Sequence, residues 1–185
     1  MNNASLQPKI SVCLITYNHE SFIHKAIESI LEQKGNFKYE IVIGVDLSTD
    51  KTVEICLQYQ KKYPEIIKVL ETKERLGLMK NYARILQACT GEFIAFCSGD
   101  DYWIDPEKLQ KQLTFLETHT TYGMVYSNYK VLLSSRNLLI NNAHNSKSMP
   151  QGDCKDQFIN GSEGVMTITS LIRREALNSN YFTFI

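Results

Sequence analysis

Short apolar runs recur along the first hundred residues, and each is followed by a longer segment of mixed polarity. The runs lie at residues 10–16 (ISVCLIT), 40–46 (EIVIGVD), 66–70 and 93–97 (FIAFC). They are continuous rather than alternating and are rich in β-branched side chains, which is typical of strands buried on both faces. We therefore expect four buried strands in this part of the chain.

The segments between these runs predict helices, because their apolar side chains recur at spacings of three and four residues. Glycine or proline follows three of them, and Ser, Thr or Asp precedes two, as is typical of helix ends and starts. In chain order, the predicted helices lie between Ser21 and Gly35, between Asp50 and Pro64, between Gly77 and Gly91, and after Asp105-Pro106.

Strands that alternate with helices predict an α/β fold with a mostly parallel sheet and helices on both faces. The usual arrangement places the first strand centrally, between the second and the fourth, in the order 3-2-1-4. Residues 122–133 predict a further strand or hairpin arm, residues 134–164 a loop rich in Asn and Ser, and residues 165–173 a last strand. We expect a single domain over residues 1–185.

Composition limits the classes of partner and of cellular location. The formal net charge is zero, whereas a protein that binds nucleic acid by its phosphates usually has a basic excess. The five cysteines are odd in number and show no C-x-x-C spacing, which favours a reducing compartment over a disulfide framework. No signal peptide and no transmembrane-length apolar run occur. We expect a cytoplasmic protein without nucleic acid, for which peripheral membrane contact stays open.

Polar clusters follow three of the predicted strands. Thr16-Tyr17-Asn18 follows the first, residues 46–50 (DLSTD) follow the second, and Asp100-Asp101 follows the fourth. In an open parallel sheet, ligands bind outside the carboxyl ends of the strands, at the point where the strand order reverses. If the three strands are neighbours, the clusters meet in one crevice.

The two adjacent carboxylates of Asp100 and Asp101 predict a divalent cation. Like charges that leave a buried strand repel each other, and a hard cation offsets this repulsion. Mg²⁺ or Mn²⁺ usually takes one or two protein carboxylates and completes its shell with phosphate oxygens and water. The pair therefore predicts a site where Mn²⁺ or Mg²⁺ bridges the protein to a diphosphate; a solvated turn is the alternative.

Single residues near these clusters each allow two interpretations. Asp46 could accept a hydrogen bond from a nucleotide base or be an ordinary loop aspartate, and Tyr17 could stack on a base or simply pack. Trp103, the only tryptophan, could contact a sugar or pack against the next helix. For Asp50, a helix N-cap is favoured. Two residues near the start of the third predicted helix could meet phosphate but are better explained as a solvated face: Lys80 and Arg84.

These motifs resemble those of the family 2 glycosyltransferases, which have the GT-A fold. Residues 15–20 (ITYNHE) resemble the opening T-Y-N segment of the family, and residues 45–52 (VDLSTDKT) resemble its acidic D-x-S-x-D turn. Residues 91–101 match the approach to its D-x-D-type metal motif, and residues 101–109 continue the pattern. The resemblance covers residues 9–133 and continues weakly to 173.

The resemblance implies an inverting sugar transfer from a nucleoside-diphosphate sugar, most often a UDP-sugar, to a saccharide or lipid-linked acceptor. It implies that Asp46 binds the base, that Thr16, Tyr17 and Asn18 line the nucleotide pocket, and that Asp100 contacts the ribose or metal. Asp101 would bind the metal. The nucleoside diphosphate would leave with electrostatic help, while a carboxylate base takes the acceptor proton.

The sequence departs from the family pattern at three places. Val45 and Ser98 stand where an acid is common. The catalytic base of the family follows the strand expected at 165–173, and the residues up to Ile185 do not clearly reach it, so the catalytic residue stays unknown and the acceptor side is expected to be truncated.

Three other functional classes compete with sugar transfer. A binding module that holds nucleotide-sugar without catalysis would use the same residues. A nicotinamide-dependent enzyme needs G-x-G-x-x-G after the first strand, and residues 17–20 (YNHE) contain no glycine. A nucleotidyltransferase would share the sheet and metal but favours a Gly- and Lys/Arg-rich loop there.

Overall fold

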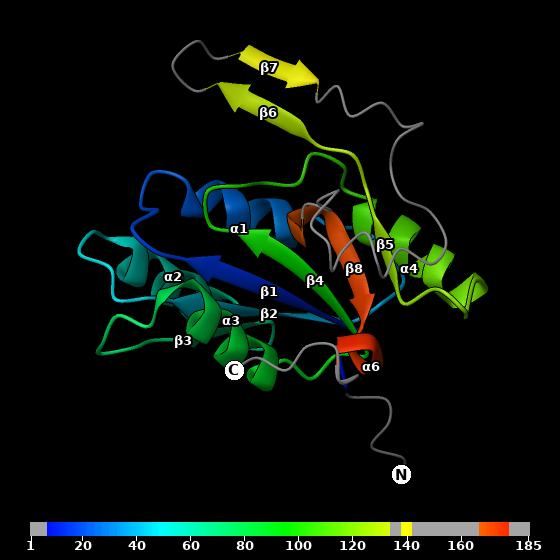
Figure 1. The fold of residues 1–185 in the computed structure, drawn as a ribbon. Helices are drawn as coiled ribbons and strands as arrows, with labels where there is room; N and C mark the ends of the chain where they lie inside the picture. Colours follow the sequence, from blue (N-terminus) through cyan, green and yellow to red (C-terminus); the bar gives the residue numbers. More distant parts are fainter. Residues whose placement is uncertain (1–6, 134–137, 142–166, 178–185) are drawn as a thin grey trace.

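The structure is a computed structural model that describes residues 7–133, 138–141 and 167–177. A six-stranded sheet in the order β3-β2-β1-β4-β8-β5 forms its centre, and β6 and β7 form a separate two-stranded ribbon (Figure 1). The described strands are β1 (Ile10–Thr16), β2 (Tyr39–Val45), β3 (Ile67–Leu70), β4 (Phe93–Ser98), β5 (Met124–Tyr126), β6 (Lys130–Leu133), β7 (Leu138–Asn141) and β8 (Ser170–Arg173).

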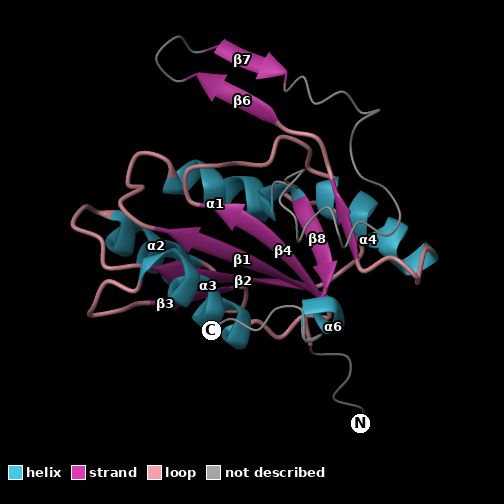
Figure 2. Ribbon diagram, viewed as in Figure 1, coloured by secondary structure: helices cyan, strands magenta, loops and turns pink. Residues whose placement is uncertain are grey.

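Helices connect the parallel strands, as Figure 2 shows. β1 pairs in parallel with both β2 and β4, and β2 pairs in parallel with β3, whereas β8 is antiparallel to β4 and β5. The mostly parallel α/β sheet and its 3-2-1-4 order are therefore confirmed. The described helices are α1 (Ile23–Leu31), α2 (Thr52–Lys62), α3 (Gly77–Ala88), α4 (Lys108–Thr118), α6 (Arg174–Leu177) and the 3₁₀ helix η3 (Thr167–Thr169).

Apolar side chains fill both faces of the sheet because successive residues of a strand point to opposite sides. In β1, Val12 and Leu14 join the larger core, which α1, α2 and α4 cover. Cys13 and Ile15 point the other way, into the smaller core beneath Ile85 of α3. This two-sided burial explains the continuous apolar runs in the sequence.

The register brings the strand ends that carry the polar clusters to one level. Thr16 of β1 lies opposite Val45 of β2, and Ile15 lies opposite Ser98 of β4. The loops that follow these strands therefore leave the sheet at the same edge, on the side toward which the arrowheads of β1, β2 and β4 point in Figure 1.

The region after residue 122 differs from the sequence-based expectation. The expected strand at 122–133 is two strands, β5 in the main sheet and β6 in the ribbon. Part of the expected loop is strand β7, which pairs with β6 through Val131 opposite Ile140. The Asn- and Ser-rich composition around β7 concealed a strand of four residues. The remainder of that loop, at 142–164, lies outside the described residues.

The last strand is shorter than expected. Residues 167–169 form η3, and only Ser170–Arg173 form strand β8; residues 165 and 166 are not described. Four cysteines, Cys13, Cys56, Cys89 and Cys97, are free and buried, in agreement with their interpretation as small apolar side chains. In the described part of the chain, every helix is too short or too polar to cross a bilayer.

Candidate nucleotide and metal site

The polar clusters after β1, β2 and β4 are in contact. Asp46 donates its backbone N–H to the Thr16 carbonyl (2.9 Å), and Gly99 donates its N–H to the Ile15 carbonyl (2.8 Å). A Cβ atom on Gly99 would lie 2.4 Å from Thr16 Oγ1, so only glycine allows the β4 loop to pass this close to the β1 loop. The structure thus brings together Thr16, Asp46 and the Asp100-Asp101 pair, as the sequence predicted.

The β1 loop is joined to the β2 loop by hydrogen bonds around Asn18. Asn18 has a positive φ of 52°, a conformation that asparagine tolerates better than most residues. Its backbone N–H donates to Ser48 Oγ (3.1 Å), and its side-chain oxygen accepts from the Thr49 N–H (2.9 Å). Asn18 therefore shapes the loop pair, and its carbonyl oxygen is occupied by the protein itself.

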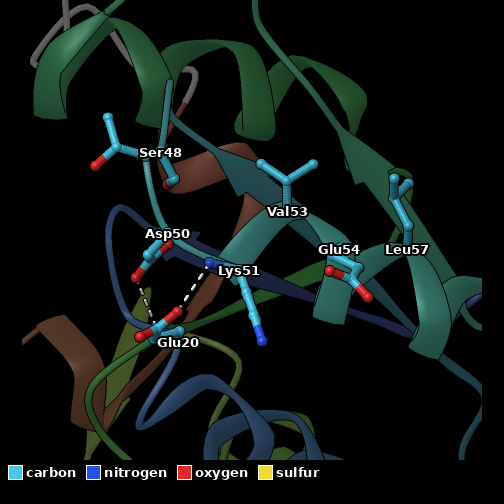
Figure 3. A pocket seen from close by; sticks show the side chains of 8 residues that line it. Glu20, Ser48, Asp50, Lys51, Val53, Glu54 and Leu57 are labelled. Carbon is cyan, nitrogen blue, oxygen red and sulfur yellow. Dashed lines mark hydrogen bonds between the residues drawn. The ribbon is translucent and has the colours of Figure 1, made fainter.

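Asp50 caps the start of α2 and links it to the β1 loop. Its carboxylate accepts from the N–H groups of Thr52 (2.9 Å) and Glu20 (3.0 Å), while Glu20 accepts from the Lys51 N–H (2.9 Å). The N-cap residue itself is Lys51, which makes no side-chain cap bond, so Asp50 binds the first N–H of α2 from one residue before the N-cap. An open hollow lies on the outer side of these bonds, lined by residues that include Val53 and Leu57 (Figure 3). Asp100 and Asp101 are not part of it.

Asp46 is buried, with 4% of its surface exposed, and its carboxylate holds the turn before α3. Oδ1 accepts from the N–H groups of Leu47 (2.9 Å) and Leu76 (2.8 Å), and Oδ2 accepts from Gly77 (2.9 Å). Burial opposes its ionisation, but these three donors, with the charge of Arg75, hold the pKa of Asp46 below its ordinary value. Asp46 is therefore an ionised group that organises two loops of the edge.

Asp100 and Asp101 form the acidic part of the edge. The Asp100 side chain is 51% exposed and lies 3.9 Å from Nε2 of His19, and the Ser98 hydroxyl donates to its carboxylate. Partial burial and the neighbouring charge of Asp100 raise the pKa of Asp101, an effect that His19 opposes. The pair therefore carries negative charge that the protein only partly offsets.

The ring of Tyr17 faces a cation of the protein. The Arg75 guanidinium carbon lies 4.4 Å from its centroid, a geometry of cation–π attraction. Arg75 is exposed and comes just before the turn that Asp46 holds. Tyr17 and Arg75 together thus border the edge beside Asp46.

Three further residues have roles that the sequence left open or misjudged. Trp103 packs against the larger core, with its ring 4.3 Å from Lys108 Nζ, which favours the packing interpretation over sugar contact. Arg84 is not on a solvated face, because its guanidinium donates to the carbonyls of Val45 (2.7 Å), Leu70 (3.1 Å) and Glu71 (2.9 Å). It binds the carboxyl ends of β2 and β3 and does not point toward a phosphate. Lys80 is exposed.

Sequence reasoning missed His19, Ser98 and Arg75 as members of the site. The histidines of the sequence have no metal-ligand spacing, yet His19 contacts Thr16 Oγ1 (3.2 Å) as well as Asp100. Its place in the first loop after β1 was the signal that could have found it. Among the described residues, no three His, Cys, Asp or Glu side chains gather into one cation site. A cation here would rest on one or two carboxylates, as is usual for Mg²⁺ beside phosphate.

An open, mostly parallel α/β sheet with acidic and aromatic side chains at its switch point is typical of proteins that bind a ligand at the carboxyl ends of their strands. The sequence profile described as "Glycosyl transferase family 2" matches residues 11–180. The chain therefore belongs to glycosyltransferase family 2, a family of enzymes, and its sheet is that of the GT-A fold.

Relatives and solved structures agree with this membership. The putative glycosyltransferase EpsE of Bacillus subtilis is 38% identical over 118 residues, which are 64% of this chain and 42% of EpsE. The mannosyltransferase PcManGT of Pyrobaculum calidifontis, solved with GDP-Man and Mn²⁺, has a TM-score of 0.61 and 26% identity, over 71% of this chain and 38% of its own. Staphylococcus aureus TarS in complex with UDP has a TM-score of 0.67 and 25% identity, over 93% and 48%.

The chain spans only part of the relatives that it matches. The match covers 36% of the length of a Mycobacterium tuberculosis relative and 42% of EpsE. The activity of a whole protein of this kind therefore enters only as a proposal.

Proposed function

We propose that this chain binds the nucleoside-diphosphate part of a sugar donor, with Mn²⁺ or Mg²⁺, at the carboxyl edge of β1, β2 and β4. The observation that carries the proposal is that Asp46 and the loop of Asp100 and Asp101 both contact the loop after β1, at one edge of the sheet. Structural neighbours solved with GDP-Man and Mn²⁺ and with UDP support this ligand class.

The acidic pair fits a hard divalent cation. Asp101 has a raised pKa because burial and the charge of Asp100 disfavour its ionised form, and a cation would relieve both effects. Asp101 and Asp100 would hold the ion. When bound, Mn²⁺ or Mg²⁺ supplies positive charge beside the leaving diphosphate.

The residues around the pair would bind the rest of the donor. Tyr17, with Arg75 over its ring, offers an aromatic face for the base, and Thr16 and Asn18 shape the pocket floor. Asp46 holds the turn at Leu76-Gly77 in place. With its remaining acceptor capacity, it would accept a hydrogen bond from an N–H group of the base. Ser98 and His19 orient Asp100 from either side.

As part of a whole enzyme, the site would serve sugar transfer with inversion to a saccharide or lipid-linked acceptor. The acceptor hydroxyl oxygen would form a bond to the anomeric carbon as the bond from that carbon to the diphosphate oxygen breaks. The electron pair would leave with the nucleoside diphosphate, and the hydroxyl proton would pass to a carboxylate base. That base stays unassigned. Free, buried thiols such as Cys13 and Cys97 support the reducing, cytoplasmic location that we propose.

Calorimetry of UDP, GDP and dTDP in the presence and absence of Mn²⁺ tests the proposal. We expect one nucleotide, most strongly UDP, to bind only with Mn²⁺, and Asp101→Ala to abolish this binding. Glu117→Gln, which removes an exposed carboxylate at the opposite edge, is the matched control and should bind as the wild type does. Metal-independent binding, or equal binding by Asp101→Ala, would contradict the proposal.

A further inference from the structure

The loop that follows Asp101 is fastened to α1 by buried polar side chains. Ser29 Oγ accepts the Trp103 N–H (3.0 Å), and Gln33 donates to the Asp105 carbonyl (2.8 Å). Ser29 and Gln33 are 6% and 8% exposed. Burying such groups is costly unless they form hydrogen bonds, and here the bonds are made to the backbone of the loop that carries the acidic pair.

Lys108, the first residue of α4, lies under the same loop. It is 7% exposed, and its Nζ lies 4.3 Å from the centroid of the Trp103 ring. Nζ also donates to Gln112 Oε1 (2.8 Å), and the Gln112 amide nitrogen donates to the Thr169 carbonyl (2.8 Å). Lys108 therefore connects the loop after β4 with η3, which leads into β8.

The charge of Lys108 has no carboxylate partner within the part of the chain that the structure describes. Burial lowers its pKa to about 8, which reflects the cost of keeping an ammonium group out of water. An apolar side chain of the same length would fill this place without that cost. Packing alone therefore does not explain a lysine here, whereas its contact with the face of Trp103 needs the positive charge.

We propose that Lys108 is a positioning residue for the cation site, acting through Trp103 and Gln112. Its ammonium group holds the Trp103 ring at a constant position relative to residues 167–169. The ring in turn fixes the backbone that carries Asp100 and Asp101. The effect on ligand binding rests on the proposed function, but the ordering of Trp103 does not. Lys108 itself contacts neither the acidic pair nor the edge where the donor is proposed to bind.

The variant Lys108→Met tests this inference because it keeps the length and apolar stem of the side chain and removes the charge. Trp103 is the only tryptophan of the chain, so its fluorescence reports on this loop alone. We expect only a small change in the midpoint of thermal unfolding, because removing the buried charge offsets the loss of the hydrogen bond to Gln112 Oε1. We also expect easier quenching of Trp103 by acrylamide and about tenfold weaker binding of UDP with Mn²⁺, as is usual for outer-shell partners of a metal site. Lys62→Met is the control, since Lys62 is exposed and lies 5.2 Å from the ring of Tyr63 on α2.

Each outcome decides the inference. Wild-type quenching and wild-type UDP affinity in Lys108→Met would overturn it, as would a fall in affinity that only follows a fall in the unfolding midpoint. If the wild type binds no nucleotide with Mn²⁺, the proposed function fails, and quenching of Trp103 alone then tests the role of Lys108. If Lys108→Met does not fold, Gln112→Met, which cuts the link to Thr169, must show easier quenching, and unchanged quenching would overturn the inference.

Discussion

The two ends of the central strands carry acidic side chains in opposite states. At the amino ends, Glu40 accepts hydrogen bonds from Ser11 Oγ (2.5 Å) and from Thr90, and Glu92 pairs with Lys9 (2.7 Å). At the carboxyl ends, Asp100 and Asp101 are adjacent, and His19 at 3.9 Å is the nearest basic group among the described ion pairs. The same sheet thus has one end with balanced charge and one end without.

This difference distinguishes carboxylates that stabilise the fold from carboxylates that are available to a ligand. A carboxylate that is already bonded by its own protein contributes to folding and has little charge left to offer a cation. Burial and the adjacent charge of Asp100 raise the pKa of Asp101, and a cation can relieve this repulsion. Charge at the carboxyl end therefore favours a ligand, and variants at the two ends should differ in their effect on ligand binding.

The largest expected difference concerns ligand-dependent stability. With Mn²⁺ and UDP at about 100 times the dissociation constant, binding should stabilise the wild type by about 2.7 kcal/mol, a rise of roughly 5–10 °C in the unfolding midpoint. Asp101→Asn should lose this rise while being at least as stable without ligand, because the repulsion is gone. Differential scanning calorimetry checks both, and Glu92→Gln at the amino end should keep the full rise. A ligand-induced rise in Asp101→Asn would refute the assignment of Asp101.

One glycine at each end of the sheet lies in close contact with its surroundings, Gly91 at the amino end and Gly99 at the carboxyl end. The two contacts differ in kind. A Cβ on Gly91 would meet backbone atoms, 2.5 Å from the Ser11 nitrogen, whereas on Gly99 it would meet the side chains of Thr16 and His19. Gly91→Ala should lower the free energy of unfolding by about 3 kcal/mol, and Gly99→Ala by about 1 kcal/mol, because side chains yield more easily than backbone. Urea unfolding of both variants measures this difference in the free energy of unfolding.

For nucleotide affinity, the two substitutions should rank in the opposite order, with Gly99→Ala having the larger effect. Among folded molecules, Gly91→Ala should bind UDP with Mn²⁺ as the wild type does, and Gly99→Ala should bind at least tenfold more weakly, because it separates the β1 and β4 loops. Calorimetry at a temperature where both variants are folded makes the comparison. Equal loss of affinity in both variants would show that the two ends are not functionally distinct.

The sequence predicted the parts of the molecule that depend on apolar pattern. Two-sided burial produces continuous apolar runs, so strands β1 to β4 followed from residue types, and their 3-2-1-4 order followed from the usual arrangement of such strands. This order accounts for the contacts of Thr16 with Asp46 and with the Gly99 loop. Roles that depend on loop conformation did not follow. Arg84 looked like a solvated helix residue, because its bonds to the Val45 and Leu70 carbonyls exist only once β2 and β3 lie side by side.

The positive φ of Asn18 and the turn at Leu76-Gly77 illustrate the same limit. Each is fixed by hydrogen bonds to a residue about 30 positions away in the sequence. Such bonds leave no periodic signal, so the sequence does not show that Asp46 holds the turn at Leu76-Gly77. Strand β7 was missed for a related reason, because a four-residue strand is specified by its partner β6 more than by its own composition.

A moderate effect is expected from Asp46, whose three donors are all backbone N–H groups. Asp46→Asn replaces an acceptor oxygen by an NH₂ group and leaves one donor unpaired, which should cost about 1–3 kcal/mol of unfolding free energy. Because the folded-state pKa of Asp46 is lowered, its contribution is present above the unfolded-state pKa and is lost as pH falls through the folded-state pKa.

Urea unfolding at pH 7 and at successively lower pH checks this prediction. The difference between wild type and Asp46→Asn should shrink as the pH falls. Ser29→Ala is the control, because it removes another buried acceptor, that of the Trp103 N–H (3.0 Å), at a similar cost. The described hydrogen bonds of Ser29 Oγ are made to backbone groups only, so its difference from the wild type should not change with pH in this range. Parallel pH profiles for the two variants would contradict the ionised role of Asp46.

The smallest expected effect comes from the exposed charges of the amino end. Lys9 pairs with Glu92 (2.7 Å) and Glu117 (3.2 Å); partial burial works against its charge, but these two bonds raise its pKa. Lys9→Met should nevertheless lower the free energy of unfolding by less than about 1 kcal/mol, because exposed ion pairs are screened by water. The raised pKa means that this contribution is present below the unfolded-state pKa and is lost as pH rises through the folded-state pKa. Unfolding in low and high salt should show the loss at low salt only. A loss of several kcal/mol of unfolding free energy that salt does not reduce would contradict this prediction. It would mean that Lys9 stabilises the amino end by packing and not by its charge.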